Sequence, residues 1–154
     1  MSVPRHLILA DGDFGPLTSK TANSIIRFQP DRVVAVLDRQ HAGKTSQDIL
    51  GAGGDIPVVA SMQEGLALGA NSVLIGIAPV GGQLPDEWRA WLREAIEGGC
   101  NIVSGLHTFL GDDPLLAEAA RIHGRRIEDL RRPPTNLPVA SGRAKVTDAL
   151  RGLA

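Results

Sequence analysis

Tyrosine is absent from this sequence of 154 residues, and aromatic residues make up only 3% of it. Stacking on aromatic rings is the usual way in which proteins hold single-stranded nucleic acids, so we expect no nucleic-acid partner. The core must instead be built from valine, isoleucine, leucine and alanine, which is typical of parallel sheets covered by helices. The chain length and the 43% hydrophobic content predict a single substantial core.

Cysteine is almost as scarce, because Cys100 is the only one. This excludes an internal disulfide framework and a thiolate-rich metal site, and the four scattered histidines have no metal-ligand spacing. We therefore expect no metal, and we expect Cys100 to be a packing residue. No apolar run reaches about 18 residues and no signal-peptide pattern is present, so we expect a cytoplasmic protein without a membrane partner.

Charge is unevenly distributed along the chain. Residues 1–120 contain 8 basic and 14 acidic residues, whereas residues 121–154 contain 8 basic and 3 acidic residues. Two interpretations remain open: a solvated charged face, or a surface that meets an acidic ligand or a neighbouring domain. The basic residues concerned include Arg125, Arg126, Arg131, Arg132, Arg143 and Lys145.

Strand and helix patterns alternate along the chain. Short apolar, β-branched runs predict strands at His6–Ala10, Val33–Asp38, Ile56–Ala60, Ser72–Ile77, Asn101–Ser104 and Arg126–Leu130. Amphipathic or capped segments predict helices at Ser19–Phe28, Ser46–Leu50, Ser61–Leu68, Pro85–Glu97 and Pro114–His123. We expect Asp113 to cap the last of these helices and Gly124 to follow its end. Such repetition favours an α/β, Rossmann-like doubly wound sheet, mainly parallel, of about six strands with helices on both faces.

The texture changes after Leu130. Three prolines between residues 131 and 138 exclude a central strand there, so this stretch predicts an extended connector. We expect a Rossmann-like domain over residues 1–132, and a proline-containing linker or tail over residues 133–154 that leads toward a second domain absent from this sequence.

Ligands of doubly wound sheets bind at the carboxyl ends of the strands. One such end carries the glycine-rich loop Gly76–Gly82, in which Pro79, Gly81 and Gly82 let backbone approach a ligand. Another carries Gly12, but between Asp11 and Asp13, which would repel a phosphate. Local turn formation by these aspartates is the competing interpretation.

Two further strand ends are followed by candidate ligand-binding or catalytic side chains. Asp38 stands where an acid can accept hydrogen bonds from a ribose, although a turn or helix cap is equally open. Gly43-Lys44-Thr45 lacks the first glycine of a P-loop, because Asp38 occupies that place; Lys44 remains a candidate single cation or a solvated side chain. His107 follows Gly105 after the fifth predicted strand and is the candidate catalytic acid or base, or a purely structural histidine.

The order of these motifs resembles a known family. The segments that carry the resemblance are 36–38, 41–44, 56–59, 76–82, 104–110 and 129–134. Together they are similar to the N-terminal domain of the D-glutamate N-acetyltransferase (DgcN-like) family, formerly a domain of unknown function. The motif residues that match are Asp38, His41, Gly43, Lys44, Pro79, Gly81, Gly82, Gly105 and His107.

The resemblance implies a Rossmann-like domain that precedes a P-loop-type domain, and acetyl transfer from acetyl-CoA to an acidic amino acid such as D-glutamate. A second, weaker likeness, in the layout of segments 56–59 and 94–99, is to the CoA-binding domain of succinyl-CoA synthetase. We therefore expect acetyl-CoA or another nucleotide as ligand. Gly12 and the motif residues named above, apart from His107, are the expected cofactor-binding residues. His107 is the expected proton acceptor.

A hypothesis of a different class stays open: a noncatalytic domain that binds an effector and docks a P-loop ATPase-like partner through its basic tail. A nicotinamide-dependent dehydrogenase ranks third, since its glycine fingerprint is absent. If a partner domain is needed, we expect the isolated chain to be inactive. The sequence also leaves a homo-oligomer open.

Overall fold

The computed structural model describes residues 3–133, and for Val80 it describes the backbone alone. Its strands are β1 His6–Leu9, β2 Val33–Leu37, β3 Val58–Val59, β4 Ser72–Ile75, β5 Asn101–Ser104 and β6 Ile127–Asp129. Its helices are α1 Lys20–Phe28, α2 Ser46–Leu50, α3 Met62–Ala67, α4 Asp86–Glu97 and α5 Pro114–His123. Every predicted strand and helix is present. The predicted connector after Pro133 lies outside the described residues.

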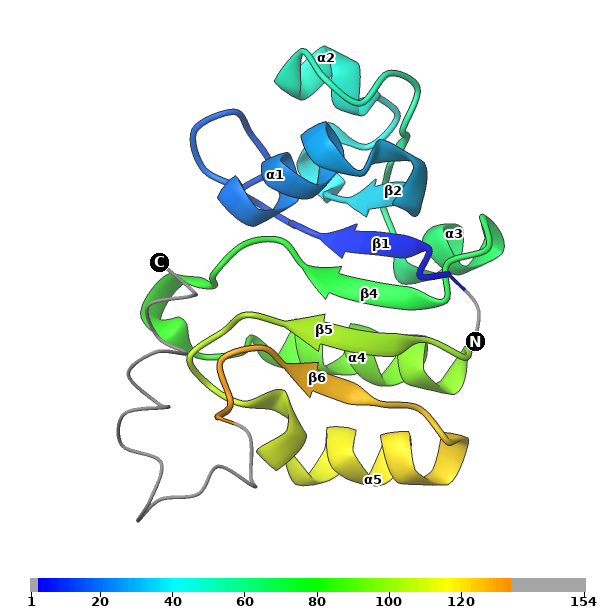
Figure 1. Cartoon of the computed structure of the whole chain (residues 1–154), viewed down its shortest axis with the longest axis vertical. Coiled ribbons are helices and arrows are strands. Elements are labelled where there is room, and N and C mark those ends of the chain that lie inside the picture. The colour runs from blue at the N-terminus through cyan, green and yellow to red at the C-terminus, as the bar shows by residue number, and fades with distance from the viewer. Residues whose placement is uncertain (1–2, 134–154) are drawn as a thin grey trace, which may run out of the picture.

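The six strands form one sheet in the order β3-β2-β1-β4-β5-β6, and every neighbouring pair is parallel (Figure 1). This is the doubly wound Rossmann order, so the predicted fold class is confirmed. The chain leaves β1 toward β2 on one side and returns to β4 on the other. The gap between the carboxyl ends of β1 and β4 is therefore the switch point at which such sheets bind ligands.

Helices cover both faces of the sheet, as neighbouring residues of β1 show. Leu7 packs against Gly65 of α3, whereas Ile8 points to the opposite face, toward Ala22 of α1. The helices α4 and α5 pack on each other, and α4 also contacts α3. All four side chains of β1 and of β4 are buried, so the switch point stands on a rigid base.

Capping residues set the ends of α4 and α5. We expected Pro85 at the first helical position, but α4 begins at Asp86 and Pro85 is its extended N-cap residue. At α5 the prediction is confirmed: Asp113 Oδ1 accepts hydrogen bonds from the backbone N–H groups of Leu115 and Leu116. Gly124 ends α5 with a left-handed φ of 64°.

Candidate functional site

A cavity of about 380 Å³ opens at the switch point. The turn after β1 and the loop after β4 line it, with the start of α4 below. One wall is apolar, formed by Ile77, Ala78, Pro79, Pro85 and Trp88. The other wall consists of Asp11, Gly12 and Asp13. A mostly apolar cavity with a few polar groups at this place in the fold is the best candidate ligand site of the domain.

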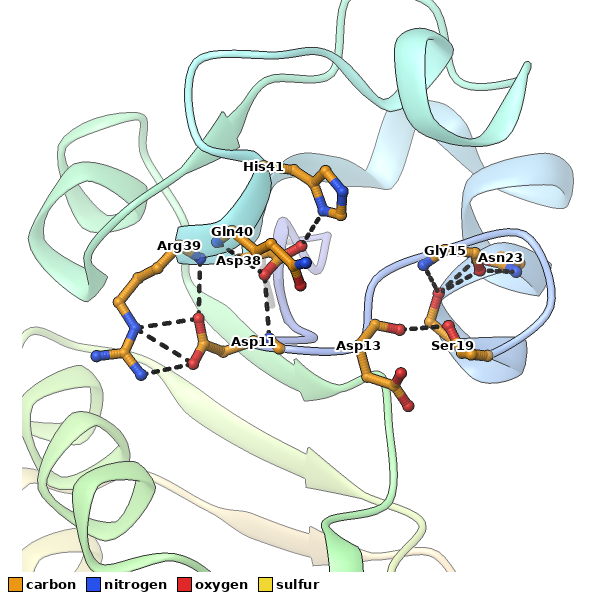
Figure 2. A network of polar contacts seen from close by, with 11 residues as sticks. Asp11, Asp13, Gly15, Ser19, Asn23, Asp38, Arg39, Gln40 and His41 are labelled. Carbon is orange, nitrogen blue, oxygen red and sulfur yellow. Dashed lines mark hydrogen bonds and ion pairs between the residues drawn. The ribbon is translucent and has the colours of Figure 1, made fainter.

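Asp38 is the central anchor of the polar wall and is fully buried. Its Oδ1 accepts hydrogen bonds from the backbone N–H of Gly12 at 3.0 Å and of Gln40 at 3.2 Å. Its Oδ2 lies 2.6 Å from Nδ1 of His41 (Figure 2). The carboxylate that we considered for a ribose therefore bonds protein groups. It also occupies the Gly12 N–H that a pyrophosphate would need.

Arg39 ties three elements together beside this anchor. Its guanidinium binds Asp11 after β1 at 2.8 Å and Glu87 at the start of α4 at 2.7 Å, and it lies over the ring of Trp91. Burial alone would raise the pKa of the Asp11 carboxyl, but the hydrogen bonds from Arg39 outweigh it and hold that pKa below its usual value. Arg39 was not among the residues predicted from the sequence, although its position next to Asp38 at a strand end was a signal.

Asp13 contributes a carboxylate of another kind. Its backbone bonds Ala10 and Thr18, but within residues 3–133 its exposed side chain has no hydrogen-bond or ion-pair partner. Asp13 is thus held in the turn through its backbone, whereas the Asp11 carboxylate binds Arg39, so neither carboxylate makes a hydrogen bond within the local turn. An unpaired carboxylate in the cavity wall favours a neutral or positively charged ligand group over a phosphate.

The glycine loop after β4 does two different things. Gly76 is packed so tightly that an added Cβ would lie 2.5 Å from Ile8 and 3.0 Å from Ala22. Gly81 and Gly82 have left-handed φ angles of 80° and 72°, and the space beside them is open. Thr108 Oγ1 donates to the Gly82 carbonyl at 3.2 Å, which joins this loop to the one after β5.

The remaining predicted residues lie apart from the cavity. His107 is exposed, and its ring has no polar partner within residues 3–133. Gly43 and Lys44 are exposed on the turn after β2, and the Lys44 ammonium likewise has no partner in this part of the chain. The Gly105 carbonyl accepts a hydrogen bond from Arg131. The structure thus brings Gly12, Asp38, His41 and Pro79 close to the switch point, and places His107 elsewhere.

The basic residues near position 130 have structural partners. Arg132 pairs with Asp112 at 2.7 Å and stacks on Phe109 at 4.4 Å. Asp129, almost fully buried, accepts hydrogen bonds from the backbone N–H groups of Leu110 and Gly111. These contacts fasten the loop after β5. Neither of our interpretations of the basic segment, solvation or docking, included this internal role for Arg132.

The sequence of this domain matches a known family. Residues 39–133 match DUF1611_N, a Rossmann-like domain of unknown function. The chain belongs to the DUF1611_N family. A curated relative from Tritonibacter scottomollicae is 32% identical over 143 residues, which are 92% of this chain and 40% of the relative. That relative is named D-glutamate N-acetyltransferase.

Solved structures agree. A crystal structure of a DUF1611 family protein from Anabaena variabilis superposes with a TM-score of 0.79 at 35% identity, over 94% of this chain and 42% of that one. A homoserine dehydrogenase from S. aureus shares the fold alone, with a TM-score of 0.52 at 14% identity over 83% of this chain and 33% of its own. This DUF1611_N chain spans less than half the length of these relatives.

Two features are absent from residues 3–133. No helix in this range is long and apolar enough to cross a membrane. Nor do three or more histidine, cysteine or acidic side chains of this range gather into a group that could hold a metal ion.

Proposed function

We propose that this DUF1611_N domain forms part of an enzyme that transfers the acetyl group of acetyl-CoA to the amine of an acidic amino acid such as D-glutamate. The name of the Tritonibacter relative suggests the reaction. The observation in this chain that carries the proposal is the switch-point cavity, with its apolar wall from Ile77 to Trp88 and its carboxylate wall.

The chemistry of the cavity indicates which part of acetyl-CoA it would receive. A phosphate does not fit, because Asp11 and Asp13 line the wall and Asp38 already occupies the Gly12 N–H. The uncharged thioester arm of CoA suits the apolar side formed by Ala78, Pro79 and Trp88. The exposed Lys44 ammonium lies apart from this cavity, on the turn after β2, and remains a candidate single cation for a phosphate outside it.

The unpaired Asp13 carboxylate suits the attacking amine. Amino acids carry an ammonium group at neutral pH, and a carboxylate attracts that group at close range. Asp11 is less available, since Arg39 binds both of its oxygens. In this arrangement Asp13 orients the amine, the apolar wall orients the thioester, and the cavity brings the two reacting groups together.

A thermal-shift panel tests the proposal. The chain is melted with CoA, acetyl-CoA, ATP, NAD or D-glutamate, because a ligand that binds only the folded state raises the melting temperature. We expect CoA and acetyl-CoA to stabilise the chain more than NAD. Stabilisation by NAD alone would contradict the proposal and return the dehydrogenase hypothesis.

A second function, the docking of a partner domain, is favoured by one observation. Val103 and Glu128 are paired across β5 and β6 and stand in register with Ile8 of β1, so they point to the α1 side of the sheet. Glu128 is exposed there, and Val103 is only partly buried. Figure 1 shows α1 over the other half of the sheet. If a partner domain docks there, Val103→Glu should lower the melting temperature of the protein purified from its own cells, with any partner present. The same change should lower the melting temperature of this chain alone by less. Equal effects would count against docking.

A further inference from the structure

His41 is held as catalytic histidines are held. Its Nδ1 lies 2.6 Å from Oδ2 of Asp38, whose side chain is completely buried. An ionised carboxylate can only accept a hydrogen bond, so in the neutral form of the ring Nδ1 carries the proton and the lone pair is on Nε2. Nε2 has no partner within residues 3–133, and the side chain is 25% exposed. The ring therefore offers a proton acceptor to a ligand.

The holder of the ring is itself fixed. Asp38 follows β2 directly and is the N-cap residue of the short turn Arg39–His41. Its Oδ1 is bound by the backbone N–H groups of Gly12 and Gln40. Hydrogen bonds from two chain segments prevent the carboxylate from turning, so the orientation of the His41 ring is set before a ligand arrives.

The same carboxylate connects His41 to the switch-point cavity. Gly12, which it binds, lines that cavity. An added Cβ at Gly12 would have no atom within 4 Å, so open space lies above this turn. Figure 2 shows the ring beside Asp38, with the turn that carries Asp13 next to them. His41 is not part of the cavity lining, so a ligand reaches its ring by extending from the cavity past Gly12 and the Asp38 carboxylate.

We propose that Nε2 of His41 accepts the proton of the attacking amine, and that Asp38 is its positioning residue. This rests on the proposed acetyl transfer. The ammonium group of the substrate first releases one proton to water. The neutral amine nitrogen then forms a bond to the thioester carbonyl carbon, the carbon–sulfur bond breaks, and its electron pair leaves on sulfur. The proton lost by nitrogen goes to Nε2 and then to sulfur, which gives the free thiol. Atoms and charges balance without an oxidant or reductant.

The test compares histidine variants in the protein as its own cells make it, so that any further segment or partner is present. Thiol release from acetyl-CoA is measured with D-glutamate as acceptor. We expect His41→Gln to lower kcat about 10²-fold or more, while KM stays within about threefold. His123→Gln, an exposed histidine at the end of α5, is the control and should match the wild type.

Two further variants separate a chemical role from a structural one. In His41→Gly, added imidazole should restore a measurable part of the lost rate, because a free base can enter the space. In Asp38→Asn, the amide can donate to Nδ1 and move the ring proton to Nε2. Nitrogen NMR of the ring should detect that change of tautomer. The activity assay of the same variant should show a lower kcat.

The outcomes distinguish the two proposals. An active wild type with an active His41→Gln variant would overturn the role of His41 and leave the acetyl transfer standing. Loss of activity in His107→Gln, with His41→Gln unaffected, would overturn it as well and assign the proton to His107. A His41→Gly variant that imidazole does not rescue would overturn the chemical role. An inactive wild type would overturn the proposed function and this role together.

Discussion

Nη2 of Arg39 lies 2.8 Å from Oδ2 of Asp11, and this ion pair joins the turns that follow β2 and β1. Asp11 is almost buried while Arg39 is half exposed, and Nη1 of the same guanidinium reaches Glu87 at 2.7 Å. One side chain therefore connects the turns after β1 and β2 to α4. Such a branched contact restricts the shape of the cavity mouth more than a single surface pair does.

Replacing Arg39 tests this connection. We expect Arg39→Ala to lower the free energy of unfolding by about 1–2 kcal/mol. Arg93→Ala, which breaks only the exposed pair with Glu97 on α4, should cost about 0.3 kcal/mol. Urea unfolding of the two variants gives the comparison. Equal losses would mean that Arg39 is an ordinary surface residue.

The same pair predicts a dependence on pH. Hydrogen bonds from Arg39 hold the pKa of Asp11 below its usual 3.8 despite the opposing effect of burial. A lowered carboxyl pKa adds stability above the pKa of the unfolded chain, and that stability disappears as pH falls through the folded pKa. The difference between wild type and Arg39→Ala should therefore shrink as pH falls below about 4. A difference that grows in acid would contradict this assignment.

Gly76 is predicted to be the least replaceable glycine of its loop for stability. Gly76→Ala would place a Cβ 2.5 Å from the Ile8 side chain and 3.3 Å from the Leu9 carbonyl, so we expect a loss of about 2–3 kcal/mol. Gly105→Ala is the control, since no atom lies within 4 Å of its added Cβ. Thermal melts decide between them. A melting temperature for Gly76→Ala equal to that of Gly105→Ala would show that the packing of Ile8 and Ala22 around Gly76 has room for a Cβ.

The cap of α5 gives a further stability test. Asp113 bonds two backbone N–H groups of α5 and pairs with Arg89 at 2.6 Å, so Asp113→Ala should cost about 2 kcal/mol. Asp112→Ala removes a neighbouring, more exposed carboxylate that binds Arg132, and it should cost less than about 1 kcal/mol. Urea midpoints measure both. The reverse order would make the Arg132 contact the stronger anchor.

Cys100 should be unreactive in the folded protein. It is fully buried, and this burial raises the pKa of its thiol to about 11, although Arg125 acts in the opposite direction. A disulfide reagent at neutral pH should therefore modify it only as fast as the protein opens, and at once in denaturant. Rapid labelling of the native protein would contradict the packing role.

The sequence was sufficient to predict the sheet because its signals were local. β-branched runs such as Val33–Leu37 predicted buried strands, and Asp113 and Gly124 indicated the two ends of α5. Pro85 was misplaced by one position, since proline is compatible both with the first helical residue and with the extended residue before it.

The site was less predictable because its contacts join distant segments. The sequence marked Asp38 and His41 through their place at a strand end, yet it gave no means of seeing that they bond each other. Arg39 contacts Glu87, which lies 48 positions away along the chain. His107 drew attention because histidine can titrate near neutral pH, but only the fold shows that its ring lies apart from the cavity.

Calorimetric titration of acetyl-CoA into three forms of the chain tests the central claim most directly. Ala78 is exposed on the apolar wall of the cavity, so Ala78→Phe should fill that space and weaken binding about tenfold or more. Ala90→Phe adds the same bulk to the exposed side of α4, outside the lining of the cavity, and should bind like the wild type. If Ala78→Phe binds acetyl-CoA as tightly as the wild type, or if only Ala90→Phe loses affinity, the switch point is not the ligand site.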